Sequence, residues 1–453
     1  MAAWRISLAA IVCLLFSAPA IYAESPLLWR GSVESDQRMM LRDERDWAWN
    51  ENRLDLTMER RSQQLRVTAN VWLRHLGPSV VTSSGDLFDK DRVSPWNLDI
   101  RELYLDVPGF LSDKLDMRVG RQRIAWGTAD RFNPTDNLNP PDLEDLLDFG
   151  RANGSDAISL QWWFNHQNSL QLVHIARFQP ANMPLGPFSD LFALEFVLPT
   201  LHGDIPIPIE NKSVNLPPNN LGEGSTLAAR FSTFILNTDL SISYVYGRDY
   251  LPLPDSIHIE MDQPTGEFHS SARLVYPRHH VIGADMAGSI GRLGIWAEAG
   301  VFIPEREMRT EVIVEPFDWH EEMVALKKEA YLKFVLGCDY SFSGGTYANI
   351  QYVRGFFHEG GRDGLNDYLI LQTERDLLRY HLRIQPLAGG VTVSDWDDPK
   401  NHYAWFYSPE ITYHGIDNLE ISLGGFFSDG KGDHLFAGLK DKHMLRLKIT
   451  ASF

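Results

Sequence analysis

The chain is poor in cysteine, in long apolar runs and in positive charge. Its 453 residues include two cysteines, Cys13 and Cys338. If export removes the N-terminal segment that holds Cys13, Cys338 stands alone and no disulfide can form within the chain. Beyond that segment, no stretch reaches the ~18 apolar residues that a membrane helix requires. With 60 acidic and 42 basic residues, the net charge is −18, which argues against a basic stripe for nucleic acid.

Motifs of catalysis and cofactor binding are also absent. There is no glycine-rich phosphate or dinucleotide loop, no H-E-x-x-H zinc motif and no nucleophile elbow. His279 and His280 are adjacent on an expected strand, so they point to opposite faces and do not share one ion. We therefore expect no enzyme activity, no cofactor and no metal site. A lipase-type barrel, with its serine and histidine on distant strands, is the enzymatic alternative that the residues leave open.

The first 23 residues have the organisation of a secretory signal peptide. A short basic region ends at Arg5, the apolar run ISLAAIVCLLF follows, and the small residues SAPAIYA come next. This order predicts cleavage after Ala23, with Ala20 as second choice. The expected domain plan is a signal peptide over residues 1–23 and one exported domain over residues 24–453.

Most of the exported chain alternates apolar and polar residues with the period of a β-strand. Many such segments reach ten residues, whereas soluble strands are usually ~6 long and membrane strands need ~9–11 to cross at a tilt. Short connections alternate with long ones such as residues 178–224 and 304–329, as in a transmembrane barrel. A propeller would show a sequence repeat of fixed period, and the chain has none. The clearest alternation is at the end of the chain, with apolar Leu445, Leu447, Ile449, Ala451 and Phe453.

These patterns predict an all-β fold, a single transmembrane antiparallel β-barrel. We expect about 18 strands, with 16 as the alternative, because both ends on the periplasmic side require an even count. Short turns would face the periplasm, and long loops, some folded inward, would face the outside. A last strand that ends on Phe453 resembles the assembly signal of bacterial outer-membrane barrels.

Charged residues on the polar rows, Lys333 and Glu298 among them, are expected to line the lumen. Cations outnumber acids there, although the whole chain is acidic. A basic wall favours anionic solutes by focusing the field, whereas pairing of these charges with one another would remove that preference. The residues expected at the lumen and its constriction are Arg66, Arg118, Trp126, Arg131, Arg230, Arg379 and Arg383.

One loop, residues 183–210, is unusually apolar for an outer loop. Phe188, Leu191, Phe192 and Phe196 are too many large apolar side chains to face water at low cost. The segment therefore predicts either a lid folded into the barrel mouth or an apolar entrance for an amphipathic solute.

Two further segments are predicted to form loop helices. The acidic run over residues 142–148 predicts either a Ca²⁺ site or the solvated face of a short helix that buries Leu143, Leu146 and Leu147. A second helix is expected over residues 319–330, where Trp319 and Met323 share one face.

The stretch RVGRQRIAWGTADRFNPTDNLNP, residues 118–140, is the most distinctive in the chain. Alternation stops after Gly120, so Arg121 and Arg123 fall on the outward row while Ile124 and Trp126 join the inward one. This break predicts a bulge or the end of the membrane crossing. The loop that follows is expected to return into the lumen and to place Arg118 and Arg131 at the constriction.

The same stretch resembles the RVGRQ, WG and Asn-Pro pattern of a family of porin-like outer-membrane β-barrels of proteobacteria. The closing strand DKHMLRLKITASF is similar to that of the family, except that Ala451 departs from the usual Tyr-Ser-Phe ending. Strand number and loop length are similar to those of alginate-export-type barrels. The resemblance covers the leader, residues 115–140 and the last strand, and it implies an outer-membrane barrel that moves hydrophobic or organic small molecules.

Together, these features predict a porin-like channel in the outer membrane of a Gram-negative bacterium, for passive passage of small anionic or amphipathic solutes. Outer-membrane lipid, lipopolysaccharide, the barrel-assembly machinery and a small-molecule solute are the expected partners. The alternative is a structural or partner barrel in an envelope complex, such as a sheath for an electron carrier or for a lipid-transfer partner. An outer-membrane enzyme ranks third.

Overall fold

The computed structural model describes residues 26–41, 46–62, 64–77, 81, 83–200, 203–432 and 434–453. The predicted signal peptide over residues 1–23 lies outside these ranges. Within them, no helix combines the length and the apolar character that a bilayer crossing demands. Helical structure in the described ranges is confined to α2 (Lys90–Val93) and the 3-10 turns η1 (Ser84–Phe88), η2 (Gly186–Phe192) and η3 (Ala437–Leu439).

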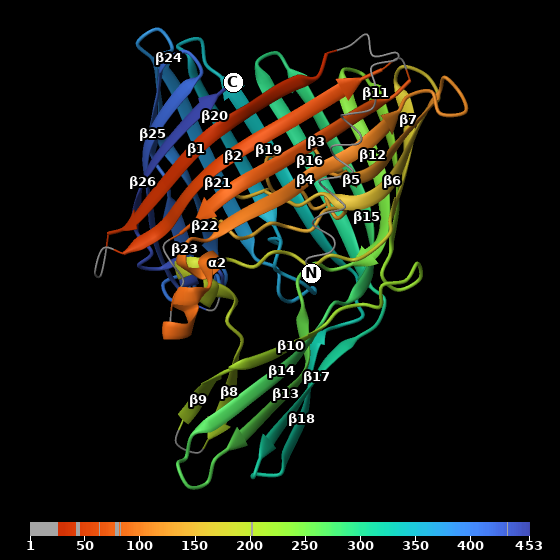
Figure 1. Cartoon of the computed structure of the whole chain (residues 1–453). Helices are drawn as coiled ribbons and strands as arrows, with labels where there is room; N and C mark the ends of the chain where they lie inside the picture. The colour runs from red at the N-terminus through yellow and green to blue at the C-terminus, as the bar shows by residue number, and fades with distance from the viewer. Residues whose placement is uncertain are drawn as a thin grey trace.

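A closed antiparallel barrel accounts for most of the chain (Figure 1). The first strand, β1 (Leu28–Met40), pairs with β2 (Trp47–Arg61) and with the last strand, β26 (Met444–Ser452), which closes the ring. The other wall strands are β3 (Arg66–Leu76), β4 (Trp96–Val107), β5 (Leu115–Gln122), β6 (Ser155–Trp163), β7 (Asn168–Ile175), β11 (Thr226–Ile235), β12 (Thr238–Arg248), β15 (Arg278–Ile290), β16 (Leu293–Pro304), β19 (Tyr331–Ser341), β20 (Thr346–Arg354), β21 (Asp367–Leu377), β22 (Leu382–Val393), β23 (Tyr403–Tyr407), β24 (Glu410–Ile416) and β25 (Leu419–Lys431).

Two of these elements, β23 and β24, are halves of one wall strand. Both lie between β22 and β25. Pro409, which has no N–H to donate to a ladder, stands at the break between them. The 19 elements that the described residues contribute to this sheet therefore form 18 strands, and the predicted 18-stranded barrel is confirmed.

Alternate residues of the wall strands point outward and form an apolar belt. On β26, Leu445 and Leu447 are exposed on the outside, whereas Arg446 and Lys448 form ion pairs with carboxylates inside the barrel. Such a belt, bordered by aromatic residues, is typical of barrels that sit in a membrane. Exposed aromatic residues lie near the strand ends: Trp163, Phe234, Tyr340, Phe342 and Tyr413 at one end, and Trp47, Trp96 and Trp405 at the other.

The two ends of the barrel differ in their connections. At the end that holds the C-terminus, tight turns such as residues 236–237 and 291–292 join neighbouring strands. The long connections leave the opposite end, which is at the bottom of Figure 1. The alternation of short and long connections is the one predicted from the sequence.

Long connections build a second β-structure beyond the barrel rim, which we call the loop sandwich (Figure 1). A hairpin of β8 (Glu195–Thr200) and β9 (Gly203–Pro208) shares an apolar core with a five-stranded sheet in the order β10-β14-β13-β17-β18. Phe196 and Ile207 of the hairpin join Ile259 and Val314 of the sheet in this core. The sheet strands are β10 (Asn211–Asn215), β13 (Leu253–Met261), β14 (Phe268–Val275), β17 (Met308–Glu315) and β18 (Trp319–Leu326).

The helix predicted over residues 319–330 is wrong. The segment forms β18, an edge strand paired antiparallel with β17 from Val314↔Trp319 onward. Pairing with β17 provides hydrogen-bond partners for the backbone of this segment. An isolated helix of the same length would be only marginally stable, because short helices need packing against other elements. Trp319 packs near Phe196, with ring centroids 5.9 Å apart, so its apolar surface serves the loop sandwich and not a helix face.

Candidate functional site

The connection between β5 and β6, residues 123–154, folds into the barrel and is called the inward loop here. Just before it, near the end of β5, stands Gly120, whose φ of 125° and closeness to the Leu103 carbonyl leave no room for a Cβ atom. Ile124 and Trp126 then turn inward as predicted, and both are buried. Trp126 Nε1 donates to Gln171 Oε1 of β7 at 2.9 Å, which ties the start of the loop to the wall.

A buried carboxylate on β16 holds the middle of the inward loop. Glu298 is 1% exposed, and its Oε2 accepts hydrogen bonds from the backbone N–H groups of Thr128 and Ala129 at 2.9 and 3.0 Å and from Asn133 Nδ2 at 3.0 Å. Its Oε1 accepts from the N–H and the hydroxyl of Thr135, both at 2.8 Å. The loop is therefore latched to a strand some 170 residues away in sequence.

Arginines of other wall strands hold the second half of the loop. Arg38 of β1 makes a two-pronged contact with Asp145, with N–O distances of 2.7 and 2.6 Å. Arg101 of β4 binds Asp142 at 2.8 Å, and Asp142 also pairs with Arg151 of the loop itself. The acidic run over residues 142–148 is thus an ion-pair anchor, and it forms no helix.

The surroundings of these carboxylates set their protonation. Burial raises the pKa of Asp145, but the Arg38 guanidinium outweighs it and holds that pKa below its usual range. The same opposition of burial and arginine charge, here from Arg151 and Arg101, lowers the pKa of Asp142. Both groups are therefore charged at neutral pH and keep the loop attached.

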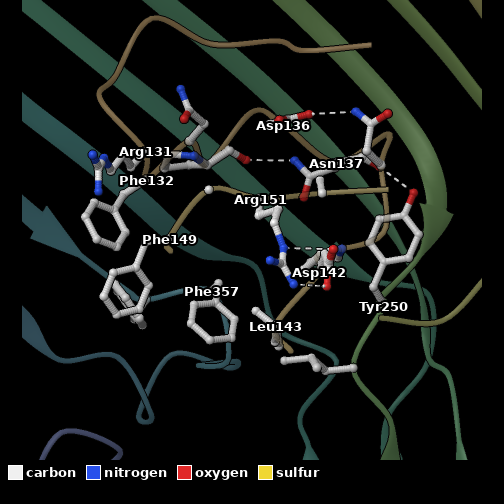
Figure 2. A pocket seen from close by; sticks show the side chains of 18 of the residues that line it. Arg131, Phe132, Asp136, Asn137, Asp142, Leu143, Phe149, Arg151, Tyr250 and Phe357 are labelled. Atoms are coloured by element: carbon white, nitrogen blue, oxygen red, sulfur yellow. Dashed lines mark hydrogen bonds and ion pairs between the residues drawn. The ribbon is translucent and has the colours of Figure 1, made fainter. Parts of the chain in front are cut away.

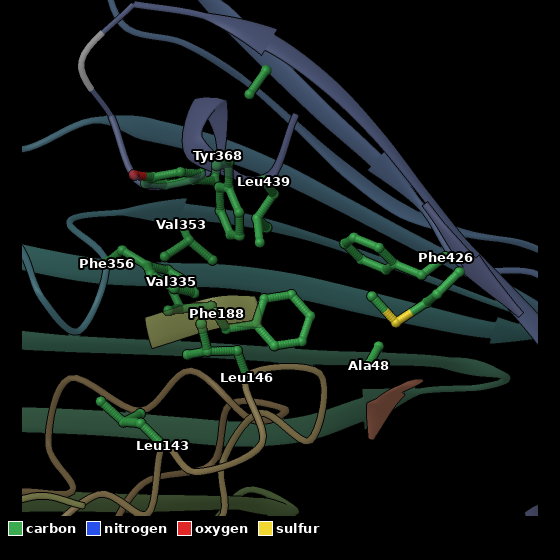
Figure 3. Close-up of a cluster of buried hydrophobic side chains, with 13 residues drawn as sticks. Ala48, Leu143, Leu146, Phe188, Val335, Val353, Phe356, Tyr368, Phe426 and Leu439 are labelled. Atoms are coloured by element: carbon green, nitrogen blue, oxygen red, sulfur yellow. The ribbon is translucent and has the colours of Figure 1, made fainter. Parts of the chain in front are cut away.

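An aromatic cluster around Phe356, which follows β20, also holds the inward loop. Phe356, which is 1% exposed, lies with its ring centroid 4.9 Å from Phe132 and 5.9 Å from Phe149 of the inward loop. Leu143 and Leu146 are buried in the same cluster, as predicted for their apolar side chains. Figure 3 shows the cluster between the inner faces of the wall strands, with Val335, Val353, Tyr368 and Phe426 facing the loop residues.

Two cavities lie on either side of the inward loop. The loop-side cavity has a volume of about 380 Å³ and is lined by Phe132, Phe149, Tyr250 and Lys333 among others (Figure 2). The turn-side cavity, of about 550 Å³, is lined by residues of β5 and β6 and of the short turns. Arg123 lines both.

An ion pair at Arg123 marks the boundary of these cavities. Arg123 binds Asp136 at 2.7 Å within the inward loop. The sequence pattern placed Arg123 on the outward row, and the structure corrects this, because the chain has left the strand at Gln122. Burial raises the pKa of Asp136, with Arg123 opposing it.

Several arginines predicted for the lumen have acidic partners. Arg118 and Arg66 share Asp106, and the Arg118 guanidinium also lies 4.2 Å from the centre of the Tyr104 ring. The other pairs are Arg230 with Asp285 at 3.1 Å and Arg383 with Asp376 at 3.0 Å.

Two predicted arginines are placed differently. Arg379 lies in the tight turn between β21 and β22, with φ of 57°, and not on the inner wall. Arg131 lines the loop-side cavity and is exposed, and within the described ranges it forms no ion pair. Arg118 lines the turn-side cavity, so the two arginines predicted for one constriction lie in different cavities.

The apolar segment over residues 183–210 divides between two places. Phe188 is fully buried in the cluster at the barrel mouth, with Leu191 and Phe192 packed against that cluster, in keeping with a lid. Phe196 instead belongs to the core of the loop sandwich. Sequence periodicity did not show this division, because both halves read as one apolar run.

The C-terminal Phe453 closes the barrel seam. Its backbone N–H and carbonyl both bond to Gly31 of β1 at 2.9 Å. A Cβ atom at Gly31 would clash with the Asp55 backbone carbonyl oxygen, so only glycine fits at this point of the seam. The ring itself is 61% exposed.

Glu298 and Lys333 emerge as site residues that sequence reasoning counted only as wall charges. The alternation places each on an inward row, but it carries no sign of the loop that reaches them. No cluster of metal-ligating side chains large enough to hold an ion occurs in the part of the chain that the structure describes.

Comparisons with known proteins give structural likeness alone. No protein-family model and no curated protein matches the chain. Among solved structures, it is similar to Salmonella typhi OmpF in a complex with daunomycin, at 10% identity over 94% of this chain and 97% of that chain, with a TM-score of 0.42. It is also similar to Acinetobacter baumannii OccAB4 (8% identity, 96% and 100% covered, TM-score 0.48) and to Pseudomonas aeruginosa OccD3, or OpdP (6% identity, 96% and 92% covered, TM-score 0.48).

Proposed function

We propose that this protein is a porin-like channel of the bacterial outer membrane, which lets small solutes pass by diffusion through a lumen narrowed by the inward loop. The observation that carries the proposal is a closed 18-stranded barrel with an apolar outer belt and with cavities on both sides of one latched loop. A barrel of this size is wide enough for an aqueous lumen unless loops fold in.

The proposed orientation follows from the connections. Outer-membrane barrels have short periplasmic turns and long extracellular loops. In this orientation the loop sandwich projects to the outside, and the C-terminal Phe453 lies on the periplasmic side, where the barrel-assembly machinery would receive it. Lipid and lipopolysaccharide would contact the apolar belt.

We expect a weaker preference for anions than the number of arginines on the inner wall implies. Arg118, Arg66, Arg230 and Arg383 all have carboxylate partners, and paired charges present little net field to a solute. A preference for anions would therefore depend on the cations without such partners, above all Arg131.

The proposal is tested by current through the refolded protein in planar bilayers. We expect discrete current steps from the wild type. Larger steps are expected from a variant in which a short Gly-Ser linker replaces residues 125–152, a link made feasible because Gln122 lies opposite Ser155 on neighbouring strands. A correctly folded barrel that passes no current in either form would overturn the proposal.

A scaffold in an envelope complex is the second candidate, and the loop sandwich favours it. Its edge strand β18 carries exposed Met323 and Val324. No other described strand pairs with its outer edge, and such an edge is suited to pairing with another chain. The absence of current together with a stable complex would select this role.

A further inference from the structure

The loop-side cavity has the form of a binding site for a small molecule. Its volume of about 380 Å³ falls within the ~300–1,000 Å³ of typical ligand pockets. Figure 2 shows Phe132, Phe149 and Phe357 gathered on one side of it and Tyr250 on the other. The aromatic faces would contact a flat apolar body over much of its surface.

A buried cation also lines this cavity. Lys333, on the inward row of β19, is 6% exposed and donates to the carbonyl of Phe356 at 2.9 Å. No carboxylate of the described residues lies within 4.0 Å of its ammonium group. The same group lies 5.2 Å from the centre of the Phe302 ring. A buried ammonium group with no carboxylate this close is costly to keep charged, so an anion that reached it would be stabilised by a charge-assisted hydrogen bond.

A second cation stands beside the aromatic side of the cavity. Arg131 has φ of 71°, a conformation uncommon outside glycine, and its side chain lies next to Phe132 (Figure 2). The acids that line the cavity are largely engaged: Asp136 by Arg123, Asp142 by Arg101 and Arg151, and Asp145 by Arg38. Asp249 accepts from the N–H of Leu251 at 3.0 Å, and Asp148 also lines the cavity.

We propose that the loop-side cavity binds an amphipathic organic anion, with its carboxylate at Lys333 and its ring system on the phenylalanines. This inference rests on the proposed channel and names its solute class. Arg131 at the entrance would guide the anion inward. Binding above the inward loop would concentrate this solute before it passes the Arg123–Asp136 pair.

The test is calorimetric titration of the refolded barrel in detergent micelles with 2-naphthoate and with the uncharged 2-naphthamide, each corrected with protein-free micelles. We expect the wild type to prefer naphthoate by about tenfold or more, as for a charge-assisted hydrogen bond. Lys333→Met should remove that preference, and Lys333→Arg should retain it. Phe357→Ala should weaken both ligands by roughly twofold to tenfold. Lys212→Met, on exposed β10 of the loop sandwich, is the matched control and should change neither.

Equal binding of the two ligands to the wild type would overturn the inference without any variant, which matters if Lys333→Met does not fold. Arg131→Gln, at an exposed loop position, adds an independent expectation of weaker naphthoate binding. Current through the same preparations separates the two proposals. If the wild type conducts current but does not prefer naphthoate, the proposed solute class is overturned and the proposed channel function stands. If the barrel binds naphthoate through Lys333 but passes no current, the proposed channel function is overturned and the proposed binding site stands.

Discussion

The latch at Glu298 gives the sharpest prediction about the lumen. In Glu298→Ala, three backbone N–H groups lose their acceptor: that of Thr135, which is buried, and those of Thr128 and Ala129, which are partly buried. A buried unpaired group costs about 1–3 kcal/mol, so leaving the loop in place costs at least that for Thr135 and up to about 9 kcal/mol for all three groups if they stay shielded from water. The first half of the loop is therefore expected to leave the β16 wall and take up water, while the arginine anchors keep the second half attached.

Glu298→Gln is expected to release the inward loop only in part. The amide keeps one of the two acceptor oxygens and turns its NH₂ group toward N–H donors at the other position. We expect single-channel conductance to rise from wild type to Glu298→Gln to Glu298→Ala, together with faster amide exchange of Thr128 and Ala129. Glu267→Gln, on the exposed surface of the loop sandwich, is the matched control. If conductance and exchange in Glu298→Ala equal those of the wild type, the loop is held by other contacts and the latch is refuted.

The remaining predictions concern charge, pH and assembly. Arg131→Gln should lower anion preference, measured as reversal potential in a KCl gradient, more than Arg118→Gln does, because Arg118 is already paired with Asp106; an equal effect would contradict this. Asp142 and Asp145 have folded-state pKa values below the ~3.9 of free aspartate, so their ion pairs stabilise the loop above about pH 4 and are lost below it. Amide exchange of residues 142–148 should stay constant from about pH 7 to 5 and increase only under stronger acid; an increase near pH 6 would exclude these groups as the cause. Phe453→Ala should reduce the amount of assembled barrel in cells, seen by heat-modifiable migration in gels. Its stability after refolding in vitro should stay within about 0.5 kcal/mol of wild type, because the exposed ring makes little contact; a large loss in vitro would show that the ring acts in the folded state.

Much of the barrel wall was predictable because its physics is local. Side-chain direction in a strand repeats every two residues, so Leu445, Leu447 and Ile449 could be placed on the outer belt from sequence spacing alone. The turns that interrupt this pattern indicated about 18 strands, and 16 was left open. Strand β18 (Trp319–Leu326) was missed because its apolar residues have helical spacing and the sequence does not show that β17 lies beside it.

What the sequence by itself determined is the barrel, a strand number near 18, and the expectation that the chain returns into the lumen after β5. What only the tertiary structure decided is how that return is held. Glu298, Arg38 and Arg101 meet the inward loop across the lumen, and no spacing along the chain encodes such meetings because closure of the barrel creates them. For the same reason most wall arginines turned out to be paired. Lys333, which was counted as one wall charge among many, lies buried beside a cavity, and no carboxylate of the described residues lies within 4.0 Å of its ammonium group.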